Sequence, residues 1–257
     1  MYLENHAFHV QFNGELSSST ILTCGVPQGS VLGPLLFVMY TAQLEDITRK
    51  HNCESHIYAD DNQIYVHCRH PDVTAAASKV ETCIKEINDW MDFNRLKLNP
   101  SKTELVWFST RQGFHKFTRA TVEVRSATID PVKYAKSLEV TLDEEFKLSK
   151  HVSNVTNSCF YQIRQLKHIR RYLDFQSAAA VVHSFVTSRL DYCNGLLAAA
   201  PAKQTDELQR VLNASARVLL RLPRYNFDLC VKVRDQLHWL RIPERVTYNY
   251  ARWYTSA

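Results

Sequence analysis

The sequence predicts an α+β fold, with an antiparallel sheet and helices on one face over residues 1–145 and an all-helical domain over residues 146–257. Two features of the hydrophobic pattern predict it. Before Glu145, short runs that alternate apolar and polar residues are interspersed with stretches of helical period, and after Glu145 only the helical period remains. The 257 residues are 45% hydrophobic, which is enough for one large or two modest cores.

Residues 1–22 predict a pair of strands, because alternating apolar residues flank a polar patch from Gly14 to Thr20. The period then changes. Proline is favoured in the first turn of a helix, and beyond Pro34 the apolar residues recur at helical spacing. The pattern therefore predicts a helix from about Pro34 to Lys50.

A tight hairpin is predicted next. Ile57–Ala59 and Ile64–Val66 are short runs rich in residues that favour strands, and only the polar turn formers Asp60 to Gln63 separate them. Asp60 and Asp61 are therefore expected at the turn of a hairpin.

One long helix and three further strands are predicted downstream. The helix follows Asp72, a suitable N-cap, keeps the 3.6-residue period to Met91 and stops before Asn99. The strands are expected at residues 105–108, 121–129 and 132–142, and the last two flank a turn at Asp130–Pro131.

Helices alone are predicted after Glu145. They are expected at residues 152–166, 175–190 and 208–219, with two more that follow Phe227 and Pro243. The chain is also unevenly charged. Residues 1–110 contain 8 Lys and Arg against 13 Asp and Glu, whereas residues 111–257 contain 23 against 13. This division fits a metal-binding region joined to a polyanion-binding one, and the alternative is ordinary solvated helix faces.

Composition excludes several classes of protein. Apolar runs are shorter than the roughly 18 residues of a membrane span, and the N-terminus does not resemble a signal peptide. The seven cysteines are scattered and include no CxxC pair, so neither a disulfide framework nor a common zinc site is indicated. We therefore expect an intracellular protein of the nucleus or cytoplasm, with reduced thiols and no membrane partner.

Asp60 and Asp61 are the strongest candidates for chemistry. Adjacent carboxylates at the tip of a hairpin repel each other unless cations neutralise them, and Mg²⁺ prefers such oxygen ligands. In nucleotidyl transfer, two ions about 3.5–4 Å apart activate the attacking hydroxyl and stabilise the leaving group. Asp is also a common turn residue, so the pair alone allows a purely structural interpretation.

The ten residues from Gly25 to Pro34 read GVPQGSVLGP and form a glycine-rich loop that opens a helix. Glycine permits close backbone approach to a ligand, and Gln28 offers both a hydrogen-bond donor and an acceptor. Together with residues 58–61, which read YADD, this segment resembles the GVPQGSVLGPLLF and YADD motifs of the reverse transcriptases of non-LTR (LINE-type) retrotransposons.

The resemblance implies a partial polymerase palm over residues 1–145, a thumb-like helical domain over residues 146–257, and RNA-directed DNA polymerase activity with two Mg²⁺ ions. RNA template, DNA primer and deoxynucleoside triphosphates are the implied partners. The resemblance implies catalytic and metal-binding roles for Asp60 and Asp61. It implies nucleotide or template binding for Pro27, Gln28, Gly29 and Tyr58. Capping of the loop is the alternative for Gln28, and packing within the sheet is the alternative for Tyr58.

Three later segments resemble motifs of the same family. Residues 98–104, LNPSKTE, place Lys102 where the family has a lysine near the departing pyrophosphate, and a surface lysine is the alternative. Residues 137–143 resemble the primer-grip hairpin, but Glu139 stands where relatives usually have glycine. We expect the larger acidic residue to strain that turn and to repel a primer phosphate. Residues 237–245 resemble a stretch beyond the thumb.

The family also carries an earlier motif, whose aspartate bridges both metal ions and which would lie upstream of Met1. We therefore expect a missing upstream polypeptide, and we expect the isolated chain not to polymerise. A non-catalytic, nucleic-acid-binding remnant of a retroelement is the alternative. A cellular RNA polymerase or a group II intron maturase is a further alternative, although neither usually pairs this loop with YADD at this spacing.

Overall fold

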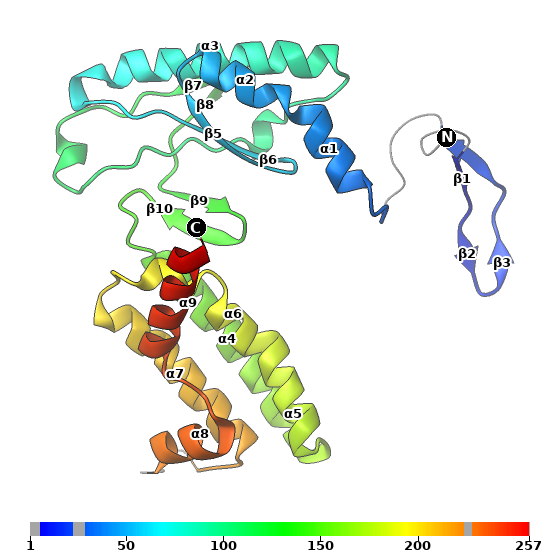
Figure 1. Cartoon of the computed structure of the whole chain (residues 1–257), viewed down its shortest axis with the longest axis vertical. Coiled ribbons are helices and arrows are strands. Elements are labelled where there is room, and N and C mark those ends of the chain that lie inside the picture. Colours follow the sequence, from blue (N-terminus) through cyan, green and yellow to red (C-terminus); the bar gives the residue numbers. More distant parts are fainter. Residues whose placement is uncertain (1–5, 23–28, 224–227, 257) are drawn as a thin grey trace. The chain divides into compact units, whose positions relative to one another are not determined.

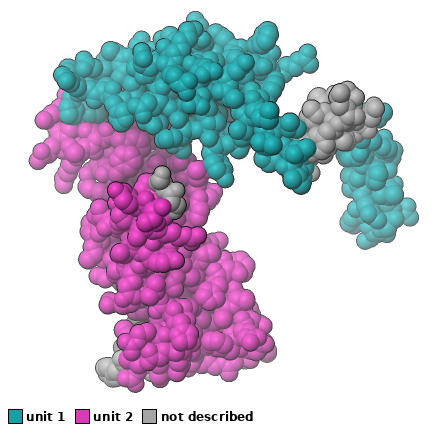
Figure 2. Space-filling view, in the orientation of Figure 1, with its two compact units in different colours: residues 1–103, 117–130 teal, residues 104–116, 131–257 magenta. Residues whose placement is uncertain are grey.

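The computed structural model describes residues 6–22, 29–223 and 228–256 (Figure 1). The chain forms two compact units: residues 1–103 with 117–130, and residues 104–116 with 131–257 (Figure 2). Each unit is described by itself below. The division at residue 145 that the sequence predicts stays a prediction.

The first described segment is a hairpin, as predicted. β1 (His6–Phe8) pairs with β4 (Thr20–Leu22), and β2 (Gln11–Phe12) pairs with β3 (Glu15–Leu16). The turn lies at Asn13 and Gly14, whose φ angles are 50° and 86°. Asn-Gly is the preferred sequence for a turn with both central residues left-handed, so the reversal comes at the start of the polar patch.

Helices α1 (Gly33–Thr41) and α2 (Gln43–Lys50) occupy the predicted helix, with a break at Ala42. The start of α1 has a local cause. The Gly33 N–H donates to Ser30 Oγ at 3.1 Å, and Pro34 stands in the first turn, where a missing N–H has no cost.

β5 (Glu54–Tyr58) and β6 (Asp61–Tyr65) form the predicted hairpin, and α3 (Val73–Phe93) is the predicted long helix. Figure 1 shows the hairpin below α2 and α3. Ile57 and Ile64 of the hairpin pack against a small core of buried side chains from α2, α3 and the segment between α2 and β5. That core comprises Leu44, Ile47, Cys53, Cys83 and Ile87.

The strand predictions after residue 100 were partly wrong. Residues 105–108 form only one isolated bridge, between Leu105 and Pro131. Each of the two long predicted strands is instead a separate hairpin. These are β7 (Val122–Val124) with β8 (Ala127–Ile129), and β9 (Tyr134–Ser137) with β10 (Val140–Asp143).

The α+β class is confirmed, but the predicted single sheet is not found in the described part of the chain. The strands there form five separate two-stranded antiparallel pairs. The predicted long strands are interrupted by turns that lack the usual turn residues. Arg125, Leu138 and Glu139 all have positive φ, although none of them is glycine or asparagine. A palm built on one continuous sheet therefore remains a proposal.

All five helices predicted after Glu145 are confirmed. They are α4 (Ser149–Ile169), α5 (Phe175–Val182) continuing through a π-helical turn (His183–Thr187) into α6 (Ser188–Asp191), α7 (Ala202–Leu219), α8 (Leu229–Leu237) and α9 (Ile242–Ser256). Short 3₁₀ turns lie at His70–Asp72, Pro100–Lys102, Gly113–His115, Arg170–Tyr172 and Asn194–Leu197.

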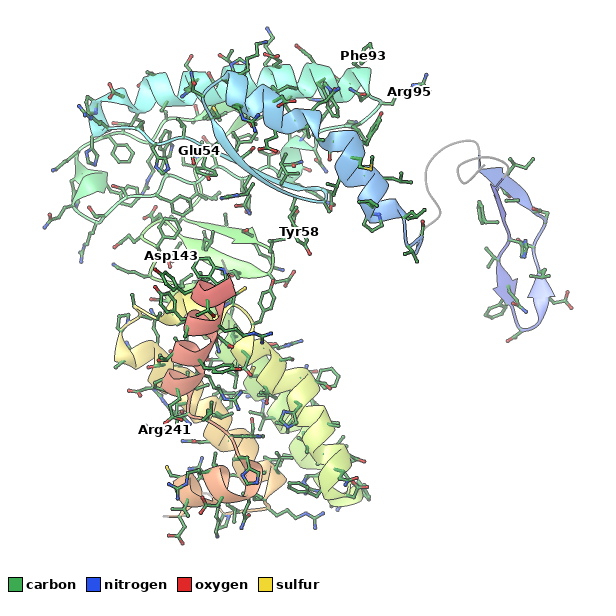
Figure 3. The ribbon with its side chains drawn as sticks, in the orientation of Figure 1. Glu54, Tyr58, Phe93, Arg95, Asp143 and Arg241 are labelled. Atoms are coloured by element: carbon green, nitrogen blue, oxygen red, sulfur yellow. The ribbon has the colours of Figure 1, made fainter. Side chains whose placement is uncertain are left out.

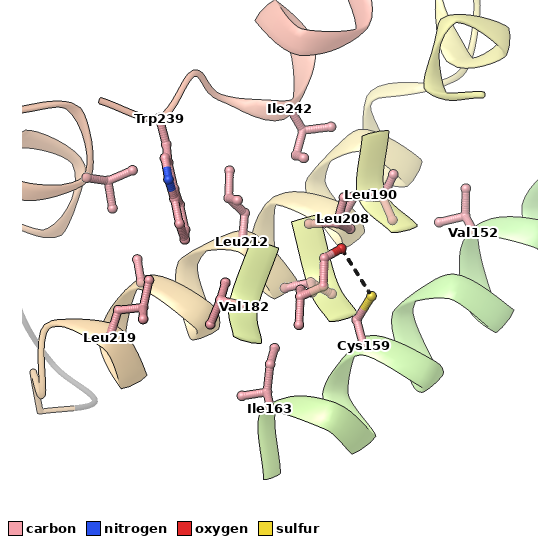
Figure 4. Packing of buried hydrophobic residues seen from close by; sticks show 14 of the residues in the cluster. Val152, Cys159, Ile163, Val182, Leu190, Leu208, Leu212, Leu219, Trp239 and Ile242 are labelled. Atoms are coloured by element: carbon pink, nitrogen blue, oxygen red, sulfur yellow. Dashed lines mark hydrogen bonds between the residues drawn. The ribbon is translucent and has the colours of Figure 1, made fainter. Parts of the chain in front are cut away.

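One continuous hydrophobic core joins these helices (Figure 4). α4 contributes Val152, Cys159 and Ile163, and α7 contributes residues such as Leu212 that are fully buried. Trp239, from the segment that the sequence places beyond the thumb, is 7% exposed and also lies in this core. That segment therefore has a structural function in closing the helical core.

Arg170 is buried, although it lies in the basic range, residues 111–257, that the charge distribution predicts to bind a polyanion. Its guanidinium donates to the carbonyls of Leu173, Val218 and Leu219 at 2.7, 3.2 and 2.8 Å. The last two carbonyls end α7, where the backbone acceptors otherwise have no partner within the helix. Across the described ranges, every helix is too short or too polar to cross a bilayer.

Candidate functional site

The site is the tip of the β5–β6 hairpin. Tyr58 is paired with Asp61 across the two strands, so only Ala59 and Asp60 lie in the turn. This corrects the predicted four-residue turn from Asp60 to Gln63. Asp60 is in the turn, whereas Asp61 is the first residue of β6.

Ala59 has a φ of 53°, in the left-handed region that costs a residue with a Cβ about 1 kcal/mol. Two-residue hairpin turns require such angles and usually use glycine for them. The tip is therefore held in a conformation that its own sequence disfavours. Strain of this kind occurs preferentially at functional sites.

Both aspartates are exposed, and neither carboxylate forms a hydrogen bond or an ion pair with any residue that the structure describes. Two exposed carboxylates suit Mg²⁺, which commonly takes one or two protein carboxylates and completes its shell with water and substrate phosphates. Among the described residues, no third His, Cys, Asp or Glu joins them to form a metal-binding group. The pair therefore fits an open metal site.

The exposed face of the hairpin continues from Asp61 along both strands. Residues directly opposite each other share a face, so Tyr58, His56 and Glu54 lie on it with Tyr65, whereas Ile57 and Ile64 face the core. Figure 3 labels Tyr58 at the tip end of β5 and Glu54 at the other end. Tyr58 is 67% exposed, so the structure does not support its packing within a sheet.

His56 is a feature of this face that sequence reasoning missed. Its Nε2 lies 3.1 Å from the Tyr65 hydroxyl, and the two rings are 5.2 Å apart. Local desolvation and the Glu54 carboxylate raise the pKa of Tyr65, so its phenol is held protonated.

The glycine-rich loop is described only in part. Pro27 and Gln28 lie outside the described residues, so their predicted roles stay predictions. Gly29 has a φ of 83°, a conformation that other residues rarely adopt, and this explains the need for glycine at that position. Ser30 Oγ then accepts from the Gly33 N–H at the start of α1, as described above.

Lys102 is exposed at the end of a 3₁₀ turn that Asn99 stabilises by accepting from the Ser101 N–H at 3.1 Å. Within the described residues its ammonium group makes no hydrogen bond or ion pair, although its backbone N–H donates to the Asn99 carbonyl at 3.1 Å. The structure therefore leaves the ammonium group available, but it does not bring Lys102 into contact with Asp60 or Asp61. Its catalytic role stays a prediction.

The turn of the β9–β10 hairpin lies at Leu138 and Glu139, with φ angles of 44° and 66°. The strain expected at Glu139 thus has a backbone origin, because glycine would adopt this angle without steric cost. The Glu139 carboxylate lies 2.8 Å from Lys136 Nζ and neutralises that cation.

A glycine-bearing loop that opens a helix, followed by two unpaired carboxylates at an exposed hairpin tip, is the arrangement expected of a metal-dependent nucleotidyltransferase. Residues 1–134 match the family described as "Reverse transcriptase (RNA-dependent DNA polymerase)". The chain belongs to this family. The non-LTR retrotransposon origin that the motifs predict is confirmed by its relatives.

Three relatives are polymerases of Drosophila mobile elements. The chain is 31% identical over 173 residues to the probable RNA-directed DNA polymerase from transposon BS of Drosophila melanogaster, covering 65% of this chain and 18% of that protein. It is 28% identical over 159 residues to the polymerase from mobile element jockey of the same species, covering 60% and 17%. It is 24% identical over 226 residues to the jockey polymerase of Drosophila funebris, covering 83% and 23%.

The chain thus spans about a fifth of the length of these relatives. No solved structure matches it.

Proposed function

We propose that the chain is the palm and thumb segment of an RNA-directed DNA polymerase, which adds deoxynucleotides to a DNA primer on an RNA template. The single observation that carries the proposal is the pair of unpartnered carboxylates, Asp60 and Asp61, at an exposed hairpin tip in a member of the reverse transcriptase family. We place the palm over residues 1–145 and the thumb over residues 146–257. Its partners imply a location in the cytoplasm or nucleus.

In this proposal Asp60 and Asp61 would hold two Mg²⁺ ions, which would supply activation of the primer 3′-hydroxyl and neutralisation of charge on the leaving pyrophosphate. The chain's own contribution is to fix two carboxylates at the hairpin tip, one in the turn and one on the first residue of β6, so that little reorganisation is needed during the reaction. Exposure of the tip leaves room for nucleotide phosphates to complete the coordination.

The other site residues position the substrates. Pro27, Gln28 and Gly29 bring backbone and an amide side chain close to the nucleotide or template, and the left-handed Gly29 allows that close approach. Tyr58 exposes its ring beside Asp61 and would stack against a base or a sugar. Lys102 supplies an exposed ammonium that would neutralise the pyrophosphate.

We also propose that these 257 residues alone do not extend a primer. Catalysis with two ions needs ligands that fix both, and no third ligand joins Asp60 and Asp61 in the described part of the chain. The test is extension of a DNA primer on an RNA template with Mg²⁺, comparing this chain with a longer polypeptide that includes residues upstream. We expect product from the longer polypeptide only, and none after Asp60→Ala.

Extension by the short chain that survives Asp60→Ala would contradict both the role of the carboxylates and the need for a further ligand. If the short chain extends the primer and Asp60→Ala abolishes that extension, only the need for a further ligand is contradicted.

A non-catalytic, nucleic-acid-binding remnant is the second candidate, favoured by the exposed cations of the helical unit. Arg164, Lys167 and Arg171 are all exposed at the C-terminal end of α4 and just beyond it. If they contact phosphates, affinity for an RNA–DNA duplex falls steeply with salt, by about tenfold or more between 50 and 200 mM. Replacing all three with glutamine should flatten that dependence. Salt-independent binding would exclude phosphate contacts.

A further inference from the structure

The β9–β10 hairpin contains a turn that its own residues disfavour. Leu138 and Glu139 both have positive φ, and each costs about 1–2 kcal/mol relative to the right-handed region. The hairpin also has only two strands, and an isolated two-stranded hairpin is marginally stable in water. Contacts from outside the hairpin must therefore hold the turn in this conformation.

Those contacts come from the helical part of the same unit. The Tyr192 hydroxyl, just beyond α6, donates to the Leu138 carbonyl in the turn itself at 2.8 Å. On β10, the Thr141 N–H donates to His151 Nδ1 of α4 at 3.3 Å. Val140 is 5% exposed and belongs to the helical core.

Of these three residues in the described part of the chain, Tyr192 is the one that bonds the strained turn directly. The other two act on the strand that follows. Loss of the hydroxyl would leave Leu138 and Glu139 attached only through β9 and β10, so their left-handed angles would lose their main external support.

We propose that Tyr192 is a positioning residue, which holds the Leu138–Glu139 turn in the conformation that contacts the primer end. The inference rests on the proposed function, because it takes the turn to be the primer grip. The helices and the hairpin then act as one body on the primer, and Tyr192 acts through Leu138 without touching the nucleic acid.

The surface that the turn presents fits this role. The Lys136 side chain is 59% exposed and lies beside the turn. Its Nζ forms an ion pair with Glu139 Oε1 at 2.8 Å. A primer phosphate would compete with Glu139 for Lys136. Movement of the turn changes the position of Glu139 relative to that cation, so Tyr192 governs whether Lys136 is available.

A double-mutant cycle tests the proposal. The four proteins are the 257-residue chain, Tyr192→Phe, Glu139→Gly and the double variant. Their affinity for an RNA template carrying a recessed DNA primer is measured by fluorescence anisotropy. Tyr192→Phe should weaken binding about threefold, the effect of one exposed hydrogen bond. Glycine adopts positive φ without strain, so in the Glu139→Gly background the same change should cost less than about 1.5-fold.

Two controls separate positioning from general damage. Tyr161 is 53% exposed on α4, and Tyr161→Phe should leave the affinity unchanged. A blunt duplex offers no recessed primer end, so its affinity should be the same for the chain and for Tyr192→Phe. The proposal would be overturned if Tyr192→Phe weakened binding equally with and without Glu139→Gly. It would also be overturned if Tyr192→Phe lowered the affinity equally for the primed and the blunt duplex.

Amide hydrogen exchange gives a readout that does not depend on nucleic acid. Tyr192→Phe should speed exchange at residues 137–141 and leave α7 unchanged. Unchanged exchange at residues 137–141 would overturn the role of Tyr192 even if the duplex binds. If the parent chain binds no primed duplex, both the proposed function and the primer contact are contradicted. Faster exchange in Tyr192→Phe would in that case still show that Tyr192 holds the turn.

Discussion

Replacement of Arg170 by methionine should destabilise the helical unit by about 3 kcal/mol. The side chain is 8% exposed and donates hydrogen bonds to three backbone carbonyls, two of which end α7. Each hydrogen bond from a charged donor contributes about 1.5 kcal/mol. The Leu173 and Leu219 carbonyls would lose the donor that Arg170 provides, whereas the Val218 carbonyl would keep the Arg221 N–H at 3.4 Å. Relief of burying the guanidinium offsets part of that total of roughly 4–5 kcal/mol. Methionine keeps the length and the apolar packing.

Urea unfolding followed by the helical circular dichroism signal measures this change. Arg171 provides the matched control, because it is the next residue and is exposed, with its guanidinium 4.7 Å from the centre of the Tyr172 ring. Arg171→Met should shift the stability by less than about 1 kcal/mol. Equal midpoints for the two variants would refute the reasoning, since burial and carbonyl capping are what distinguish the two arginines.

Three further predictions follow from local geometry. Ala59→Gly should raise the stability of the first unit by about 0.5–1 kcal/mol in urea unfolding, because glycine relieves the left-handed angle; a loss of stability would contradict strain at the tip. Burial lowers the pKa of His151 in the folded chain below its usual 6.5, so as the pH falls the unfolded chain takes up a proton before the folded chain does. The melting temperature should therefore fall as the pH drops from 6.5 towards the lowered pKa. His151→Gln should flatten this dependence, and an unchanged pH profile would exclude His151 as its source. Burial raises the pKa of Cys83 to about 12, so this thiol should resist a disulfide reagent that modifies the exposed Cys230 within minutes at pH 8; equal rates would show that the thiol is accessible.

Helix positions could be predicted well from the sequence, because buried helix faces impose a period that many residues share. The helix predicted over residues 152–166 is α4, Ser149–Ile169, and its buried residues include Val152, Cys159 and Leu166. No single residue decides such a pattern. Errors therefore affect the ends of the helix and not its existence.

Turns without glycine, asparagine or proline could not be predicted. The strands expected over residues 121–129 and 132–142 are each folded back at Arg125 or at Leu138 and Glu139, which carry no sequence mark of a turn. Ala59 misled the prediction of the β5–β6 turn in the same way. Alanine is disfavoured at positive φ, so the polar residues after it were interpreted as the turn.

The candidate aspartates could be located from the sequence, whereas their surroundings could not. Two adjacent carboxylates in a YADD context form a specific pattern, and their metal-binding role stays a prediction. His56 and Tyr65 form their contact only through the register of β5 and β6, which pairs His56 with Gln63 and sets Tyr65 two residues away. Arg170 likewise depends on carbonyls that are 48 and 49 residues distant.

Titration with Mn²⁺, a spectroscopic substitute for Mg²⁺, tests the central claim most directly. Free Mn²⁺ is followed by electron paramagnetic resonance in the presence of a deoxynucleoside triphosphate, for the chain, for Asp60→Asn with Asp61→Asn, and for Asp89→Asn. Asp89 is an exposed carboxylate of α3 outside the hairpin and serves as the matched control. The account predicts protein-dependent binding in the chain and in Asp89→Asn that disappears when both hairpin aspartates are replaced. Binding that persists in the double replacement would contradict it.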